Sequence, residues 1–139
     1  MHFNKDQTRE IIMKHYMKPQ NKKDLTPNQK NTIYSNSCAD KLIYELTWEN
    51  GVLVDAKFSG NAYCAPFVAS TDLFFEKIKG KTKDEIISFI NIFTDFVKGN
   101  DVSEYEISLL GDLWVFYNIK IQPNRIICTL LPTNVFINE

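Results

Sequence analysis

The chain has 139 residues, of which 44% are hydrophobic and 13% aromatic, and its formal net charge is −1. A chain of this length and composition can bury one sizeable core but is short for two, so we expect a single domain over residues 1–139. No apolar run approaches the roughly 20 residues of a membrane helix, and residues 1–10 do not resemble a signal peptide. We therefore expect no membrane association and a cytoplasmic location.

Basic residues are concentrated at the N-terminal end. Residues 1–30 contain seven Lys/Arg against three Asp/Glu, whereas residues 31–139 contain nine against fourteen. The lysines are scattered, and no nucleic-acid motif or interleaving of basic and aromatic residues accompanies them. The segment is therefore interpreted as a solvated helix and linker, and no nucleic-acid partner is expected.

The first predicted element is a short helix over residues 7–17, which Pro19 ends. One face of this helix carries Ile11, Ile12, His15 and Tyr16. Since it lies on a partly apolar face, His15 is interpreted as a packed or hydrogen-bonded helix histidine.

Residues 20–37 are polar and are interpreted as a linker that ends in a predicted edge strand at Thr32–Tyr34. Pro27 lies in the first half of this linker. We expect residues 1–6 and roughly 20–31 to be mobile.

Alternating apolar residues on both sides of Glu49-Asn50-Gly51 predict a β-hairpin. The expected buried face consists of Leu42, Tyr44, Leu46, Trp48, Val52, Val54, Ala56 and Phe58. For both strands to contribute to one face, Trp48 must lie opposite Val52, which makes residues 49–51 a three-residue loop.

Two amphipathic helices are predicted next, closing at Gly80 and Gly99. Their apolar positions are Phe67, Thr71, Phe74 and Ile78, and then Ile86, Phe89, Ile90, Phe93 and Val97. A short helix is expected within residues 103–119, and Pro123 opens a last helix that carries Cys128. The predicted fold class is therefore α+β, with a small antiparallel sheet of about three strands packed against several α-helices.

The cysteines are three in number, which in a reducing compartment argues against a disulfide framework. Extending the predicted hairpin register pairs Asp40 with Gly60 and Cys38 with Ala62, and places Cys64 diagonally beyond Cys38 on the same face. Diagonal neighbours are about 7–8 Å apart at Cα, so the strand ends must bend if these side chains share a metal.

The surroundings of these residues favour a metal or a reactive thiol over simple packing. Cys64 precedes a helix start with Pro66 in its first turn, where the helix dipole favours the thiolate. Arg125 lies one turn before Cys128 and offers a cation on the same helix. An inward-facing Asp40 is costly without a cation, whereas three thiolates and a carboxylate form a tetrahedral zinc set. Taken singly, each cysteine can also be a small buried hydrophobic residue.

Five motifs in chain order resemble the SufU/IscU family, also called NifU N-terminal-like. They are R-E-I-I-M-K-H-Y-M-K-P (9–19), S-C-A-D (37–40), V-D-A-K-F-S-G-N-A-Y-C-A (54–65), L-G-D-L (110–113) and P-N-R-I-I-C (123–128). The resemblance covers roughly residues 7 to 130 and implies the same α+β fold.

The resemblance also implies a set of site residues. The family's C-G-D, G-C and R-x-x-C motifs fall on Cys38-Ala39-Asp40, Tyr63-Cys64 and Arg125 to Cys128. It implies a zinc site formed by Cys38, Asp40, Cys64 and Cys128, with Arg125 in a supporting role. The 64-residue step from Cys64 to Cys128 resembles the SufU branch, and Ile127 stands where the IscU branch has a histidine ligand.

The function implied by the resemblance is iron-sulfur cluster assembly. The chain is expected to bind Zn²⁺ and to accept persulfide sulfur on Cys38 from a pyridoxal-phosphate-dependent, SufS-like cysteine desulfurase, which would make it a zinc-dependent sulfurtransferase. One alternative is a scaffold that carries a transient iron-sulfur cluster, and another is a binding module with a purely structural zinc site. A hydrolase that uses Cys64 with His15 or His2 lacks a family-type nucleophile motif.

Overall fold

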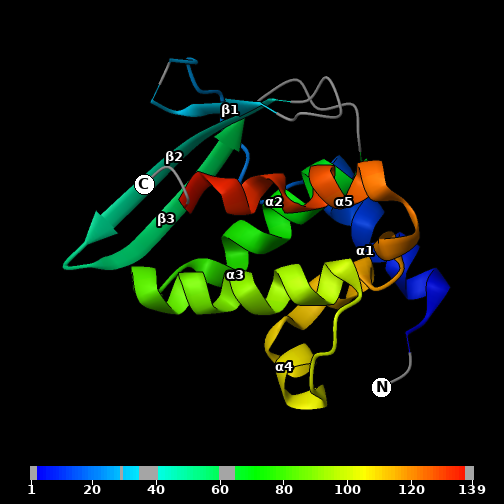
Figure 1. The fold of residues 1–139 in the computed structure, drawn as a ribbon. Coiled ribbons are helices and arrows are strands. Elements are labelled where there is room, and N and C mark those ends of the chain that lie inside the picture. The colour runs from blue at the N-terminus through cyan, green and yellow to red at the C-terminus, as the bar shows by residue number, and fades with distance from the viewer. Residues whose placement is uncertain (1–2, 29, 35–40, 60–64, 137–139) are drawn as a thin grey trace.

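The fold is given by a computed structural model, shown in Figure 1. It describes residues 3–28, 30–34, 41–59 and 65–136. Cys38, Asp40 and Cys64 lie outside the described residues. The predicted pairings of Asp40 with Gly60 and of Cys38 with Ala62 therefore lie outside them as well.

A three-stranded antiparallel sheet lies on one side of the structure, and helices cover one of its faces (Figure 1). The strands, in the spatial order β1-β2-β3, are β1 (Thr32–Tyr34), β2 (Lys41–Glu49) and β3 (Val52–Ser59). The α-helices are α1 (Lys5–Met17), α2 (Ala65–Ile78), α3 (Lys83–Lys98), α4 (Glu104–Leu109) and α5 (Pro123–Leu130). The short 3₁₀ helices η1 (Gly111–Phe116) and η2 (Ile119–Ile121) lie between α4 and α5, and η3 (Leu131–Phe136) follows α5. The α+β prediction, including the edge strand at residues 32–34, is confirmed.

The hairpin turn between β2 and β3 differs from the prediction. Asn50 and Gly51 both have positive φ angles, 53° and 79°, as a two-residue type I′ turn requires. Glu49 therefore pairs with Val52, and Trp48 lies opposite Leu53. The predicted three-residue loop with Trp48 opposite Val52 is wrong, because Asn-Gly favours the tighter turn.

An irregularity in β3 corrects the predicted buried face. Thr47 pairs with Asp55 and Trp48 with Leu53, so that Val54 is an extra residue in β3. This β-bulge exchanges the two faces of the strand beyond it. Leu53 is therefore fully buried, whereas Val54, predicted to face the core, is 41% exposed.

The tighter turn and the bulge together move the register in the rest of the hairpin, by one residue each. Tyr44 pairs with Phe58 and Leu46 with Ala56, two residues away from the predicted pairing. The predicted convergence of Cys38 with Cys64 extends the hairpin beyond the described residues and stays a prediction.

Helix α2 is the central element of the core. All four of its predicted apolar positions are buried, and the neighbouring Ala69, Leu73 and Phe75 are buried as well. The Phe74 ring lies 6.0–6.3 Å, centroid to centroid, from the rings of Phe75, Phe89, Phe93 and Phe136. This aromatic cluster joins α2 to α3 and η3, which confirms the packing interpretation of the aromatic stripes.

The helix boundaries follow from local capping. Thr82 and Glu85 form a capping box at the start of α3, and Gly99 ends α3 in the left-handed conformation. Hydrogen bonds with the backbone and side chain of Thr82 hold the pKa of Glu85 below its ordinary value. Pro123 occupies the first turn of α5, as predicted.

The start of α1 is held by aromatic packing. Phe3 stacks on Tyr117 and Trp114 at centroid distances of 4.6 and 5.7 Å, and Asn4 caps α1 by accepting from the amides of Asp6 and Gln7. Residues 1–6 are predicted to be mobile, and that prediction did not include these contacts of Phe3 and Asn4. Within the described ranges, none of the helices combines the length and apolarity that crossing a bilayer requires.

Candidate functional site

Cys128 is the one predicted metal ligand that the structure describes. It lies on α5 and is only 3% exposed, as part of the core between α5 and its neighbours. The next residue, Thr129, is also buried, and its carbonyl oxygen accepts a hydrogen bond of 2.6 Å from Ser70 Oγ on α2. Helix α5 is therefore fixed against α2 at the position of Cys128.

The described neighbours of the other three ligands lie at defined positions in the fold. Cys64 directly precedes Ala65, the first residue of α2, and Asp40 directly precedes Lys41, the first residue of β2. The β2–β3 ladder ends where Ile43 pairs with Ser59. Because β2 begins at the end of the hairpin where β3 finishes, Tyr34, Lys41 and Ser59, which border segments 35–40 and 60–64, lie at one end of the sheet.

The described residues alone do not form a metal site. Among them, no group of three or more His, Cys, Asp or Glu side chains is placed to hold a metal ion. A metal site that includes Cys128 therefore needs donors from outside the described residues.

A groove runs between α1, the start of α2 and α5. Its cavity of about 480 Å³ is lined by Lys5, Thr8, Arg9, Ile12, Met13, Ala65, Pro66 and Arg125. Three of these residues are cations, and none of the described lining residues is acidic. We call this set of residues the basic groove. It brings Arg125, one turn before Cys128, to the same cavity as Ala65, which follows Cys64.

His15 and Asp72 form a buried pair between α1 and α2. His15 Nδ1 lies 2.6 Å from Asp72 Oδ2, and the two residues are 7% and 0% exposed. The interpretation of His15 as a hydrogen-bonded helix histidine is therefore confirmed. The sequence carries a signal for this pair. Asp72 lies among the apolar residues of α2, and a buried charge needs a partner.

Asn21 is the residue that sequence reasoning missed. It is 1% exposed, although it lies in a polar stretch interpreted as linker. Its backbone amide and its side-chain amide both donate to Asp72 Oδ1, at 2.8 and 3.1 Å. No hydrophobic periodicity marks such a residue, because its burial depends on a partner 51 positions away.

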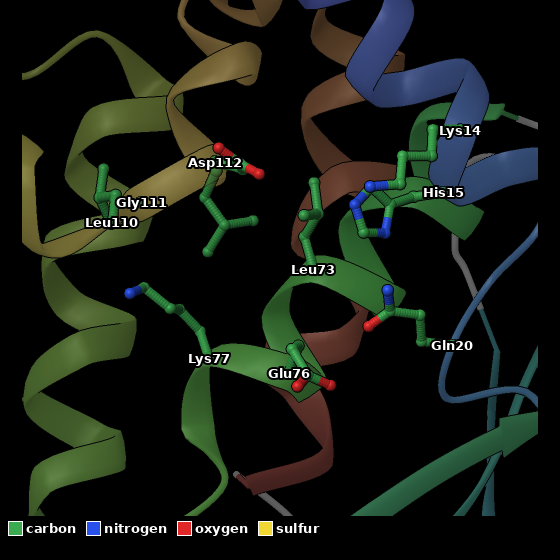
Figure 2. Close-up of a pocket in the computed structure, with 10 residues that line it drawn as sticks. Lys14, His15, Gln20, Leu73, Glu76, Lys77, Leu110, Gly111 and Asp112 are labelled. Atoms are coloured by element: carbon green, nitrogen blue, oxygen red, sulfur yellow. The ribbon is translucent and has the colours of Figure 1, made fainter.

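His15 also borders a second cavity, of about 390 Å³, between α1, α2 and the start of η1. Figure 2 shows Lys14 and His15 on one side, Leu110, Gly111 and Asp112 on the other, and Glu76 and Lys77 below them on α2. The described lining residues include no cysteine, serine or threonine. Since Asp72 lies about 10 Å along α2 from Ala65, the partner of His15 is two turns from the helix start. The alternative that pairs Cys64 with His15 is not tested, because Cys64 lies outside the described residues.

Comparison with known proteins identifies the family. The family of the NifU-like N-terminal domain matches residues 7–128. The chain belongs to this family. The resemblance seen in the five motifs is thereby confirmed across most of the chain.

Three related proteins illustrate the range of the family. The zinc-dependent sulfurtransferase SufU of Bacillus subtilis is 32% identical over 88% of this chain and 82% of that protein. The iron-sulfur cluster assembly scaffold protein IscU of Thermotoga maritima is 34% identical over 68% of this chain and 64% of that protein. The crystal structure of a SufU of Fervidobacterium islandicum, described as a cluster assembly scaffold for the SUF system, matches with a TM-score of 0.79 and 29% identity over 92% of both chains.

Proposed function

We propose that this NifU-like chain acts in iron-sulfur cluster assembly as a zinc-binding acceptor and carrier of persulfide sulfur. The observation that supports this most directly is the fixed packing of α5 on α2, which holds the buried Cys128 close to the helix that follows Cys64. A SufU relative is named a zinc-dependent sulfurtransferase, which agrees with this assignment.

The donor set fits Zn²⁺. Cys38, Cys64 and Cys128 supply thiolates and Asp40 supplies a carboxylate, the number and type of ligands of a tetrahedral zinc site. Thr129 Oγ1, beside Cys128, is buried without a hydrogen-bond partner among the described residues. Zinc would keep the thiols deprotonated at neutral pH.

Cys38 is the proposed sulfur acceptor. Its thiolate attacks the terminal sulfur of the persulfide on the desulfurase, a new S–S bond forms on Cys38, and the desulfurase cysteine leaves as a thiolate. No external oxidant or reductant is consumed in this exchange. Arg125, with the other cations of the basic groove, attracts the negative charge of the incoming persulfide.

Metal analysis tests the proposal. We expect about one zinc per chain in protein purified aerobically without added metal, and loss of zinc in both Asp40→Ala and Cys38→Ser. Transfer of labelled sulfur from a pyridoxal-phosphate-dependent cysteine desulfurase should occur with the wild-type chain and stop in Cys38→Ser.

Two other outcomes favour the alternatives. Iron and sulfide in place of zinc would support the scaffold function that the name of the Thermotoga relative describes. Zinc that stays bound while no sulfur is transferred would support a purely structural site.

The basic groove is the proposed docking surface for an acidic face of the desulfurase. Lys5, Arg9 and Arg125 line it, none of its described lining residues is acidic, and Ile12 and Met13 supply apolar contact. Charge complementarity of this kind mainly accelerates association and is weakened by salt.

Charge reversal in the groove should therefore weaken docking. We expect the double variant Lys5→Glu/Arg9→Glu to lose roughly tenfold in apparent affinity for the desulfurase at low salt, with unchanged zinc content. The matched control is the double variant Lys83→Glu/Lys98→Glu, which changes two exposed lysines at the two ends of α3 and gives the same change in net charge. Equal affinities of the two variants would contradict docking in the groove.

A further inference from the structure

Two of the five sequence motifs contain no proposed zinc ligand, and they meet at the second cavity, which His15 borders. The motif at residues 9–19 supplies Lys14 and His15 to its lining, and the motif at 110–113 supplies all four of its residues. The volume of about 390 Å³ lies within the range of small-molecule sites. We call this cavity the His15 cavity. The kind of ligand that fits it follows from its lining residues.

The polar group inside the cavity is the imidazole of His15. Among the described lining residues, only His15 combines a polar side chain with burial, and its side chain is 9% exposed. Its Nδ1 donates to Asp72 Oδ2 at 2.6 Å, because a carboxylate can only accept. No described residue hydrogen-bonds Nε2, and Figure 2 shows the ring facing the cavity. Since Nε2 donates when the ring is protonated and accepts when it is neutral, a ligand that fills the cavity must offer it a matching group.

Charged side chains of both signs surround the cavity. In Figure 2 they alternate in sign, in the order Lys14, Asp112, Lys77 and Glu76. Glu76 lies 3.4 Å from Lys79, whereas the other three form no salt bridge with a described residue. Two cations and a carboxylate without partners favour a ligand that itself carries both charges.

The apolar part of the lining is aliphatic. It consists of Leu73, Leu110 and Leu113, all of them buried. Covering such side chains with apolar ligand surface gains about 25 cal/mol per Å². The described lining residues include no aromatic side chain on which a planar ring could stack. The lining therefore favours a ligand with an aliphatic group over one with an aromatic ring.

We propose that the His15 cavity binds a free α-amino acid with an aliphatic side chain, for which leucine is the test case. The carboxylate lies beside Lys14 and His15, which share one side of the cavity, and the ammonium group faces Asp112 on the other side. Because this ligand carries an acceptor and a donor on the same carbon atom, it can satisfy His15 Nε2 in either protonation state. The inference goes beyond the proposed function, and none of the described lining residues is a proposed zinc ligand.

An NMR titration of the isotopically labelled full chain with L-leucine tests the binding. We expect saturable shifts of the backbone amides of Leu110, Gly111 and Leu113, with an affinity in roughly the millimolar range. Isocaproate lacks the ammonium group of leucine, and isoamylamine lacks its carboxylate. Each should bind about tenfold more weakly, because each loses one charged hydrogen-bonding group.

Two variants assign the two charged groups of the ligand. Lys14→Met removes a proposed partner of the carboxylate and should lose the preference for leucine over isoamylamine. Asp112→Asn removes the proposed partner of the ammonium group and should lose the preference for leucine over isocaproate. Both side chains are exposed, so we expect both variants to fold. The matched control is Lys98→Met, at the exposed end of α3, which should keep the wild-type affinity and both preferences.

Three results would overturn the inference. The first is a set of shifts that stays linear with leucine concentration, which means no specific site. The second is equal affinity for leucine and both analogues, which means apolar occupancy only. The third is wild-type preferences in Lys14→Met and Asp112→Asn. None of these results bears on zinc binding or sulfur transfer, so the proposed function stands or falls by its own metal analysis.

Discussion

Phe74→Ala is expected to destabilise the fold by about 3–5 kcal/mol, the usual cost of truncating a fully buried phenylalanine. Phe74 is 0% exposed, and its ring packs against four other phenylalanine rings from α2, α3 and η3. The loss combines the transfer free energy of the ring with the cavity it leaves, since four rigid rings cannot collapse into the space. Chemical denaturation with a linear extrapolation measures the change.

The matched control for this prediction is Ile87→Ala on α3. Ile87 is 38% exposed and lies outside the aromatic cluster, so we expect a much smaller loss, within about 1 kcal/mol. If the two variants lost equal stability, the aromatic cluster would not be the centre of the core.

Cys128→Ser is expected to weaken zinc binding by roughly 100-fold or more. Apparent zinc-binding free energies of four-ligand sites are about 10–16 kcal/mol, so one ligand accounts for roughly 3 kcal/mol, which corresponds to about a factor of 100. Cys128 is buried on α5, and a serine of nearly equal size keeps the packing while removing the thiolate. Competition with a chromophoric chelator measures the affinity.

The neighbouring residue provides the control. Ile127 is 41% exposed on the same helix, so Ile127→Ala should keep the zinc affinity of the wild-type chain. Circular dichroism on both variants separates ligand loss from unfolding. Unchanged zinc binding in a folded Cys128→Ser would remove Cys128 from the proposed site.

The helices could be predicted because their signals are local. The start of α3 is marked by Thr82 and Glu85, and its end by Gly99. The spacing of apolar residues along α2 predicts its buried face. The hairpin was placed correctly, but its register was not. The two-residue Asn50-Gly51 turn competes with a three-residue loop, and the bulge at Val54 has no periodic signature.

The candidate site could be named from the sequence because its motifs are short and in a fixed order, and family membership supports that order over residues 7–128. The predicted hairpin register was two residues away from the observed one, which changes the pairing of residues but keeps Leu42, Tyr44, Ala56 and Phe58 on the buried face. The packing of α5 on α2, through Ser70 and Thr129, is a better physical basis for bringing Cys128 toward the start of α2.

The sequence by itself determined the element types, the α+β class and the set of thiol and carboxylate residues, because capping, periodicity and motif order are encoded within a few positions. Only the tertiary structure decided the burial of Asn21. Its partners Phe58 and Asp72 are remote in sequence and meet it only when β3 and α2 pack together. Burial of a polar residue depends on such distant partners, and no local pattern records them.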